Sequence, residues 1–130
     1  MLYNDEPTKV LPRLAPKGKV IGWLVCIEGK EIGLDYRLVS GYNWVGQSEN
    51  MEIPLDDPSV AEDHHCALVY DEKHNCLFLV PQEGHDLELN DEILSQPVVI
   101  SHMDKITIGH AKFYYVAFCQ GDRTWKNIAP

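Results

Sequence analysis

The chain has 130 residues, of which 45% are apolar and 24% charged, and this balance is typical of one globular domain. A formal net charge of −9 predicts a surface that repels nucleic acid and anionic membranes, so neither is expected as a partner. No apolar run approaches the ~20 residues of a membrane-spanning helix, and the first residues lack the apolar core of a signal peptide, which favours a cytoplasmic protein.

Residues 1–19 contain three prolines and scattered charges without hydrophobic periodicity, and we expect a flexible or extended leader there. From residue 20 onward the chain consists of short apolar runs that are bounded by turn-forming residues. In chain order the runs are GWLVCIEG, LDYRLVSG, YNWVG, MEIPL, CALVY, CLFLV, LEL, PVVI, KITIG and KFYYVAF.

These runs predict about ten or eleven short strands at residues 20–118, and therefore an antiparallel sandwich or barrel. The run GWLVCIEG is continuous enough to predict a buried strand, whereas LDYRLVSG alternates, with Leu34, Tyr36 and Leu38 on one side. No segment has helical periodicity over ten residues. The polar tail at residues 119–130 either packs back on this body or is the stub of a further region.

The cysteines are predicted to be reduced core residues. Their positions are scattered, and no pair has the C-x-x-C spacing that zinc sites use, so we expect no metal and no other cofactor. Three of the four lie inside apolar runs, where a thiol behaves as a small hydrophobic side chain. The four positions are Cys26, Cys66, Cys76 and Cys119.

The stretch PSVAEDHHCAL, residues 58–68, gathers acids, histidines and a cysteine. One hypothesis is a small metal-binding or hydrolytic β-protein that uses Asp63, His64, His65 and Cys66. Neighbouring residues of a strand point to opposite faces, which disfavours one metal shared by His64 and His65. Ser59 is not part of a G-x-S-x-G elbow, so the hydrolytic form of this hypothesis has little support.

Five segments, taken in order, resemble forkhead-associated (FHA) domains over residues 22–118. WVGQS resembles the family's Gly-Arg-Ser turn, and MEIPLDDPSV resembles its I-x-L-x-D-x-x-V run. HCALV, LELNDE and MDKITIGHAKFYYVAF resemble its His-Ala-x-Ile segment, its F-V-N-G-E hairpin and its last two strands. The resemblance implies an SMAD/FHA-like, two-sheet antiparallel β-sandwich of about eleven strands, a non-enzymatic signalling module whose end loops bind phosphothreonine peptides.

The resemblance also assigns roles to single residues. Structural positions of the family correspond to Gly46, His65, Asn90 and Gly109. The phosphate-binding Arg of the first turn is replaced by Gln47, which is followed by Ser48. The family's peptide-binding Asn corresponds approximately to His85.

The family's Ser-Arg pair is replaced as well. Alignment on His65 places Ala61 and Glu62 at this pair, and a tighter spacing places Glu62 and Asp63 there. Both alignments remove the hydroxyl and exchange a cation for an acid. Because Arg and hydroxyl donors hold phosphate through charge-assisted bonds, this resemblance implies a degenerate phosphothreonine site.

We therefore expect an interaction module that binds a protein or peptide, basic or unphosphorylated, at a loop face. The segments of this face are residues 47–50, 56–64 and 82–86. The alternative within the fold is weak phosphothreonine-peptide binding, in bacterial-type Ser/Thr kinase signalling, through Gln47, Ser48, His64 and His85.

Overall fold

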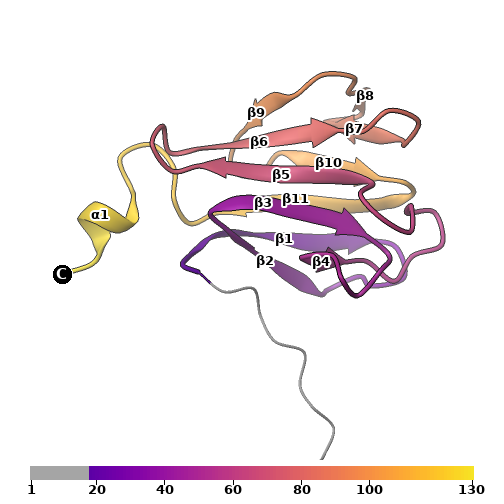
Figure 1. The fold of residues 1–130 in the computed structure, drawn as a ribbon, viewed down its shortest axis with the longest axis horizontal. Helices are drawn as coiled ribbons and strands as arrows, with labels where there is room; N and C mark the ends of the chain where they lie inside the picture. Colours follow the sequence, from indigo (N-terminus) through magenta and orange to yellow (C-terminus); the bar gives the residue numbers. More distant parts are fainter. Residues whose placement is uncertain (1–17) are drawn as a thin grey trace, which may run out of the picture.

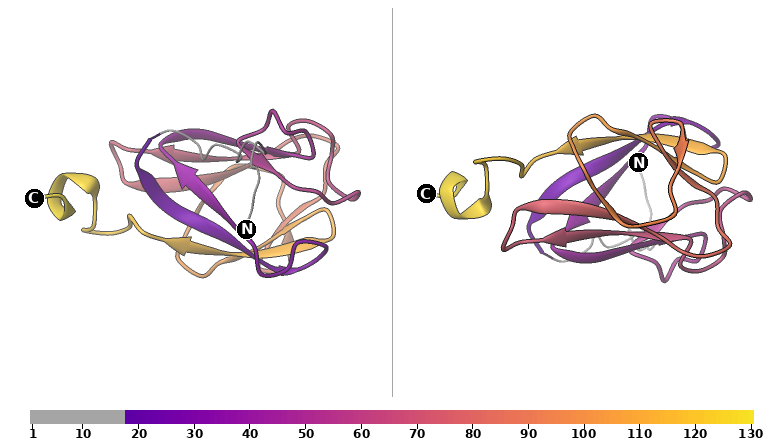
Figure 2. Two further views of the ribbon diagram at one scale, coloured as in Figure 1. Left: turned by 90° about the horizontal axis from the view of Figure 1, so that it is seen from below. Right: turned by 90° about the horizontal axis from the view of Figure 1, so that it is seen from above.

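The structure is a computed structural model that describes residues 18–130, so nearly all of the leader predicted at residues 1–19 lies outside the described residues. Eleven strands and one four-residue helix, α1 (Trp125–Ile128), make up its regular structure. They form two sheets packed face to face (Figures 1 and 2), which confirms the predicted β-sandwich.

The first sheet has six strands, and all of its neighbours are antiparallel. Its spatial order is β2 (Asp35–Val39), β1 (Val20–Glu28), β11 (Ala111–Ala117), β10 (Lys105–Ile108), β7 (Leu87–Leu89) and β8 (Glu92–Ile93). The two-residue strand β8 is absent from the runs predicted above, because two residues carry no detectable alternation.

The second sheet has five strands. Its spatial order is β4 (Ile53–Pro54), β3 (Gly41–Gly46), β5 (Cys66–Asp71), β6 (Cys76–Pro81) and β9 (Val98–Ile100). The pair β3–β4 is parallel, whereas β5 pairs antiparallel with both β3 and β6, and β9 pairs antiparallel with β6.

The core lies between the two sheets and is filled by alternate residues of each strand. Leu24, Leu68, Leu79 and Phe113 are all at most 1% exposed, and each such side chain contributes about 1.5–3 kcal/mol on burial. Strand β1 differs from the prediction of a buried strand, because only one of its faces is covered and its outward residues stay half-exposed.

Strand directions bring four loops together at one end of the sandwich, on the right in Figure 1. These loops, called the loop end below, are β3–β4 (residues 47–52), β4–β5 (residues 55–65), β6–β7 (residues 82–86) and β10–β11 (residues 109–110). The C-terminal segment lies at the opposite end (Figure 1).

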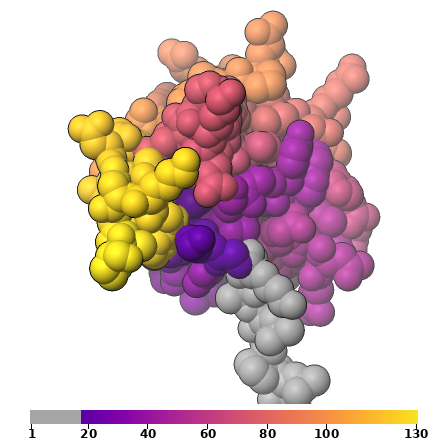
Figure 3. All heavy atoms as spheres, turned by 60° about the vertical axis from the view of Figure 1, so that its left-hand side comes forward, coloured from indigo at the N-terminus to yellow at the C-terminus, as the bar shows by residue number. Residues whose placement is uncertain are grey.

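The C-terminal tail packs back on the sandwich, one of the two outcomes considered from the sequence. The indole Nε1 of Trp125 donates a hydrogen bond to the carbonyl of Val20 at 2.6 Å. Its ring contacts that of Phe118, with 5.3 Å between centroids. Figure 3 shows this segment, in yellow, against the start of β1, in indigo. Across residues 18–130, no helix is long and apolar enough to span a membrane.

Candidate functional site

The β3–β4 and β4–β5 loops are joined by backbone hydrogen bonds. The amide nitrogens of Gln47 and Ser48 donate to the carbonyls of Ala61 and Glu62, each at 2.9 Å. The side chain of Gln47 adds a third bond, from its Nε2 to the carbonyl of Val60 at 2.7 Å. The side-chain amide of Gln47 is therefore hydrogen-bonded to the neighbouring loop. The structure also brings Gln47, Ala61 and Glu62 side by side.

His65 connects the β4–β5 loop to the β6–β7 loop. Its Nδ1 accepts a hydrogen bond from the amide of Ala61 at 2.9 Å, so the proton lies on Nε2, which donates to the carbonyl of Asp86 at 2.7 Å. The side chain is 2% exposed, and this burial lowers the pKa of its imidazole below the ordinary value. The ring of His85 covers it, with 5.1 Å between centroids.

Because His65 is buried in its neutral form, we expect the unfolding free energy to depend on pH. Its pKa is lower in the folded state, so the unfolded chain binds more protons once the pH falls below about 6.5. The unfolding free energy of the natural protein should therefore decrease between pH 7 and pH 5. The His65→Gln variant keeps a donor and an acceptor but does not titrate, so its decrease should be smaller in urea denaturation. Equal decreases for the two proteins would contradict this assignment.

A second connection ties the β4–β5 loop to the β10–β11 turn. Asp57 Oδ1 accepts hydrogen bonds from the amide and the hydroxyl of Ser59, at 2.9 and 2.6 Å. The Ser59 hydroxyl oxygen in turn accepts one from the amide of His110 at 2.8 Å. Burial alone would raise the pKa of Asp57, but the two Ser59 bonds and the nearby cations hold it below its ordinary value. The sequence signal for this connection was Asp-Pro-Ser, which is typical of Asx turns.

Glycine is required where these loops meet the strands. A Cβ on Gly46 would lie 2.9 Å from the carbonyl oxygen of Glu62. Gly109 has a φ of 61°, and a Cβ there would lie 2.5 Å from the carbonyl oxygen of Ser59. Close backbone approach therefore excludes larger residues at both positions.

Asn90 and Asp91 form the turn between β7 and β8. Their φ angles of 51° and 71° are those of a type I′ turn, in which Asn-Gly is the usual pair. The Asn90 side chain accepts a hydrogen bond from the amide of Lys105 at 2.9 Å and donates to Asp104 Oδ1 at 3.2 Å. It therefore holds the hairpin to β10.

The structure does not bring together the four residues of the metal or hydrolytic hypothesis. His64 packs against the Trp44 ring on the outside, with 4.5 Å between centroids, whereas both ring nitrogens of His65 are hydrogen-bonded. Cys66 is fully buried, and burial raises the pKa of its thiol. Within the described part of the chain, no group of three or more His, Cys, Asp or Glu side chains could hold a metal ion.

The loop end is acidic. Its loops contain no Lys or Arg. Lys30, in the neighbouring β1–β2 turn, pairs with Asp56 at 3.0 Å. Exposed acids include Glu49, Glu52, Glu62, Asp63, Glu83 and Asp86. A phosphothreonine carries about −1.5 to −2 charges, and each close like-charge pair costs on the order of 1 kcal/mol at a solvated site.

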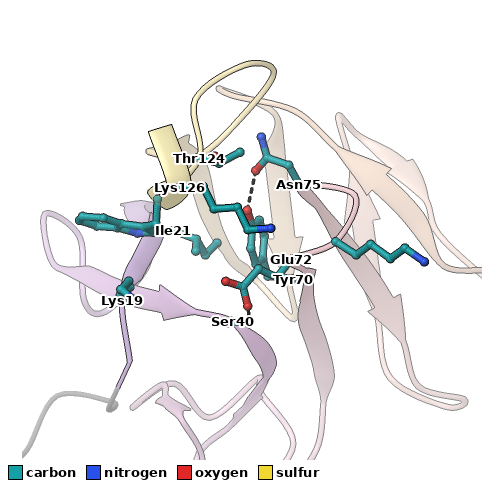
Figure 4. Close-up of a pocket in the computed structure, with 10 residues that line it drawn as sticks. Lys19, Ile21, Ser40, Tyr70, Glu72, Asn75, Thr124 and Lys126 are labelled. Atoms are coloured by element: carbon teal, nitrogen blue, oxygen red, sulfur yellow. Dashed lines mark hydrogen bonds between the residues drawn. The ribbon is translucent and has the colours of Figure 1, made fainter. Parts of the chain in front are cut away.

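A small hollow lies at the opposite end of the sandwich, between the C-terminal segment and the β5–β6 turn (Figure 4). It has a volume of about 140 Å³, and the Tyr70 hydroxyl donates to Asn75 Oδ1 at 2.5 Å in its wall. The residues that the sequence singled out for binding lie elsewhere, at the loop end.

The family model for the FHA domain matches residues 43–109, which is half of the chain and includes three of the four loops of the loop end. No curated protein matches the sequence.

Several solved structures share the fold. An FHA domain from a structural and functional analysis of phosphothreonine-dependent FHA interactions has a TM-score of 0.64 and 21% identity, covering 74% of this chain and 95% of that one. The FHA domain of CT664 from Chlamydia trachomatis has a TM-score of 0.65 and 19% identity, covering 75% and 98%. The cytoplasmic domain of PscD, a type III secretion sorting-platform protein of P. aeruginosa, has a TM-score of 0.64 and 16% identity, covering 80% and 83%.

Proposed function

Because this chain belongs to the FHA domain family, a family of protein-interaction modules, we propose that it binds a partner segment at its loop end without requiring phosphothreonine. We propose further that the module acts by binding and is not an enzyme. We place it in the cytoplasm.

The observation that carries this proposal is the loss of donors at the loop end. Where the resemblance implies Arg, Ser and Arg, the chain has Gln47, Ala61 and Glu62. The Gln47 amide is bonded to a carbonyl, and Glu62 is exposed and negative. At three positions where the family has phosphate donors, this chain thus has an amide that is already hydrogen-bonded, a methyl group and a carboxylate with the same sign of charge as phosphate.

The same charges favour a basic partner. An unphosphorylated segment with Lys or Arg would meet the carboxylates of the three acidic loops, and the net charge of −9 would steer it toward the protein. Such binding should weaken with salt, because exposed charges are screened over about 8 Å at physiological ionic strength.

This proposal predicts that phosphothreonine peptides bind no better than peptides of the same sequence with unphosphorylated threonine. Calorimetry with a degenerate phosphothreonine library and the matched threonine library, at pH 7.5, tests it. A preference of tenfold, which corresponds to about 1.4 kcal/mol, would show that phosphate donors exist at this surface.

Weak phosphothreonine binding through Gln47, Ser48, His64 and His85 is the second candidate. It is favoured by the exposure of His64 and His85, whose imidazole N–H groups can donate hydrogen bonds to phosphate oxygens. Repeating the calorimetry with the His64→Ala and His85→Ala variants distinguishes the candidates, since only this one predicts a phosphate preference that these substitutions remove.

A further inference from the structure

The outer face of the second sheet is apolar. The outward residues Tyr42, Val69, Phe78 and Val99 face one another in a single cross-strand row over β3, β5, β6 and β9. Trp44, Ala67 and Val80 form the next row. We call the residues Tyr42, Trp44, Val69, Phe78, Val80 and Val99 the outer apolar face. In Figure 1 the strands β3, β5 and β6 form the front layer.

An antiparallel sheet with one face on the core normally exposes polar residues on the other. The first sheet follows this rule in part, because the charged outward residues Asp35, Arg37, Glu88, Lys105 and Lys112 surround an apolar centre of Trp23, Val25, Tyr114 and Val116. In the second sheet, by contrast, neither of the two rows contains a charged residue, although Tyr42 is 60% and Val99 48% exposed. Tyr42 and Val99 are exposed and Val69 and Phe78 between them are half-buried, so a partner would meet an uncharged, apolar strip across this sheet.

The size of this face favours a short segment over a folded partner. Four strands at about 4.8 Å spacing and two rows at about 6.8 Å give a footprint of roughly 19 by 14 Å, or about 270 Å². A stable complex of folded proteins buries about 800 Å² on each partner. A second copy of this chain would therefore need contacts well beyond the outer apolar face.

The charge around this face favours a basic segment. Glu52 borders it, with Oε1 accepting a hydrogen bond from the amide of Trp44 at 2.8 Å, and the exposed acids Glu62 and Asp63 lie beside His64. The rings of Tyr42 and Trp44 are stacked, with 5.6 Å between centroids, and aromatic rings beside acids accommodate Lys and Arg. At the far end of β5, Asp71 already pairs with His74 at 2.7 Å and Lys73 follows Glu72, so the acids that favour a basic segment are those near Trp44.

We propose that the outer apolar face binds a linear segment of another protein that combines apolar side chains with Lys or Arg. The apolar part of this surface lies on the strands and shares only its bordering acids, Glu52 and Glu62, with the loop end, so the test below must separate the two surfaces. In this complex, the apolar side chains of the bound segment cover Phe78, Val69 and Tyr42, and its Lys or Arg side chains reach Glu52 and Glu62.

Phage-displayed random dodecapeptides, selected on the full chain, provide the test. The enriched peptides should contain apolar residues with an excess of Lys and Arg. The best peptide, made synthetically, should bind at least tenfold more weakly to each of the variants Tyr42→Thr and Phe78→Thr, because threonine keeps the strand propensity but removes the ring. Tyr114→Thr and Val116→Thr, at outward positions of the first sheet, are the matched controls and should change binding less than twofold.

Other results would overturn the proposal. If the selected peptides bind the Tyr42→Thr and Phe78→Thr variants as tightly as the unchanged chain, this face has no assigned ligand. The same holds if Gln47→Ala abolishes their binding, because they would then bind through the loop end. Concentration-dependent association of the free chain that disappears with Phe78→Thr would assign the face to a second copy. Nuclear Overhauser contacts from residues 1–17 to Phe78 in the free monomer would assign it to the chain's own leader.

Discussion

The Gly109→Ala variant is expected to lose about 2 to 5 kcal/mol of unfolding free energy. The left-handed φ of 61° costs a non-glycine residue about 1–2 kcal/mol. The new Cβ would also lie 2.5 Å from the carbonyl oxygen and 2.6 Å from the hydroxyl of Ser59, so that backbone must move. Overpacking of this kind adds about 1–3 kcal/mol, and it would displace the hydroxyl that joins Asp57 to the β10–β11 turn.

Gly121→Ala is the matched control for this variant. Gly121 has nearly the same φ, 63°, but nothing lies within 4 Å of its added Cβ. Its loss should therefore be limited to the backbone term of about 1–2 kcal/mol. Urea denaturation of both variants isolates the contact with Ser59, and equal losses would mean that this contact does not constrain the loop.

The strands could be predicted from the sequence because the alternation of apolar and polar residues along the chain matches the alternation of buried and exposed side chains in the fold. Tyr36 and Leu38 of β2 point into the core as LDYRLVSG predicts. Leu34, predicted on the same side, is 52% exposed and precedes the strand. Gly33, with a φ of 90°, ends the β1–β2 turn there, and a turn residue is not bound by the alternation of the strand that follows.

Trp44 shows why residue hydrophobicity alone does not decide which face of a strand is buried. It lies half-buried on the outer face of β3, whereas its polar neighbour Asn43 is fully buried. Asn43 is stable there because its side-chain amide is fully hydrogen-bonded. Its Oδ1 accepts a hydrogen bond from the amide of Val39, and its Nδ2 donates to the carbonyls of Val39 and Leu68. Residue hydrophobicity alone assigns the opposite orientation, and thus conceals the outer apolar face.

The loop geometry could not be predicted from spacing either. The family resemblance identified Gln47 and His65 as positions of interest, but the tautomer of His65 and the bond from Gln47 to Val60 depend on loops that meet only in the folded chain. The connection from Asp57 through Ser59 to His110 joins residues more than fifty positions apart and leaves no local periodic signal.

The triple variant Gln47→Arg, Ala61→Ser and Glu62→Arg is expected to gain phosphothreonine affinity. The three positions adjoin across two backbone bonds of 2.9 Å, so the new donors would converge on one place. Together they exchange a charge of −1 for +2 and restore one hydroxyl. A charge-assisted hydrogen bond contributes about 1.5–3 kcal/mol, so at least a tenfold preference for phosphothreonine over threonine peptides should appear in calorimetry and weaken as salt increases.

The control must separate a restored site from a change of net charge. Gln120→Arg, Ala129→Ser and Glu72→Arg make identical substitutions at exposed positions of the opposite end, with the same charge change. This control should bind acidic peptides slightly better but should not distinguish phosphothreonine from a matched peptide of equal charge. If the loop-end variant folds and shows no greater preference than the control, then Gln47, Ala61 and Glu62 do not mark a former phosphate site. If it shows the preference, the missing donors alone account for the loss of phosphate recognition, because the loops that orient them remain in place.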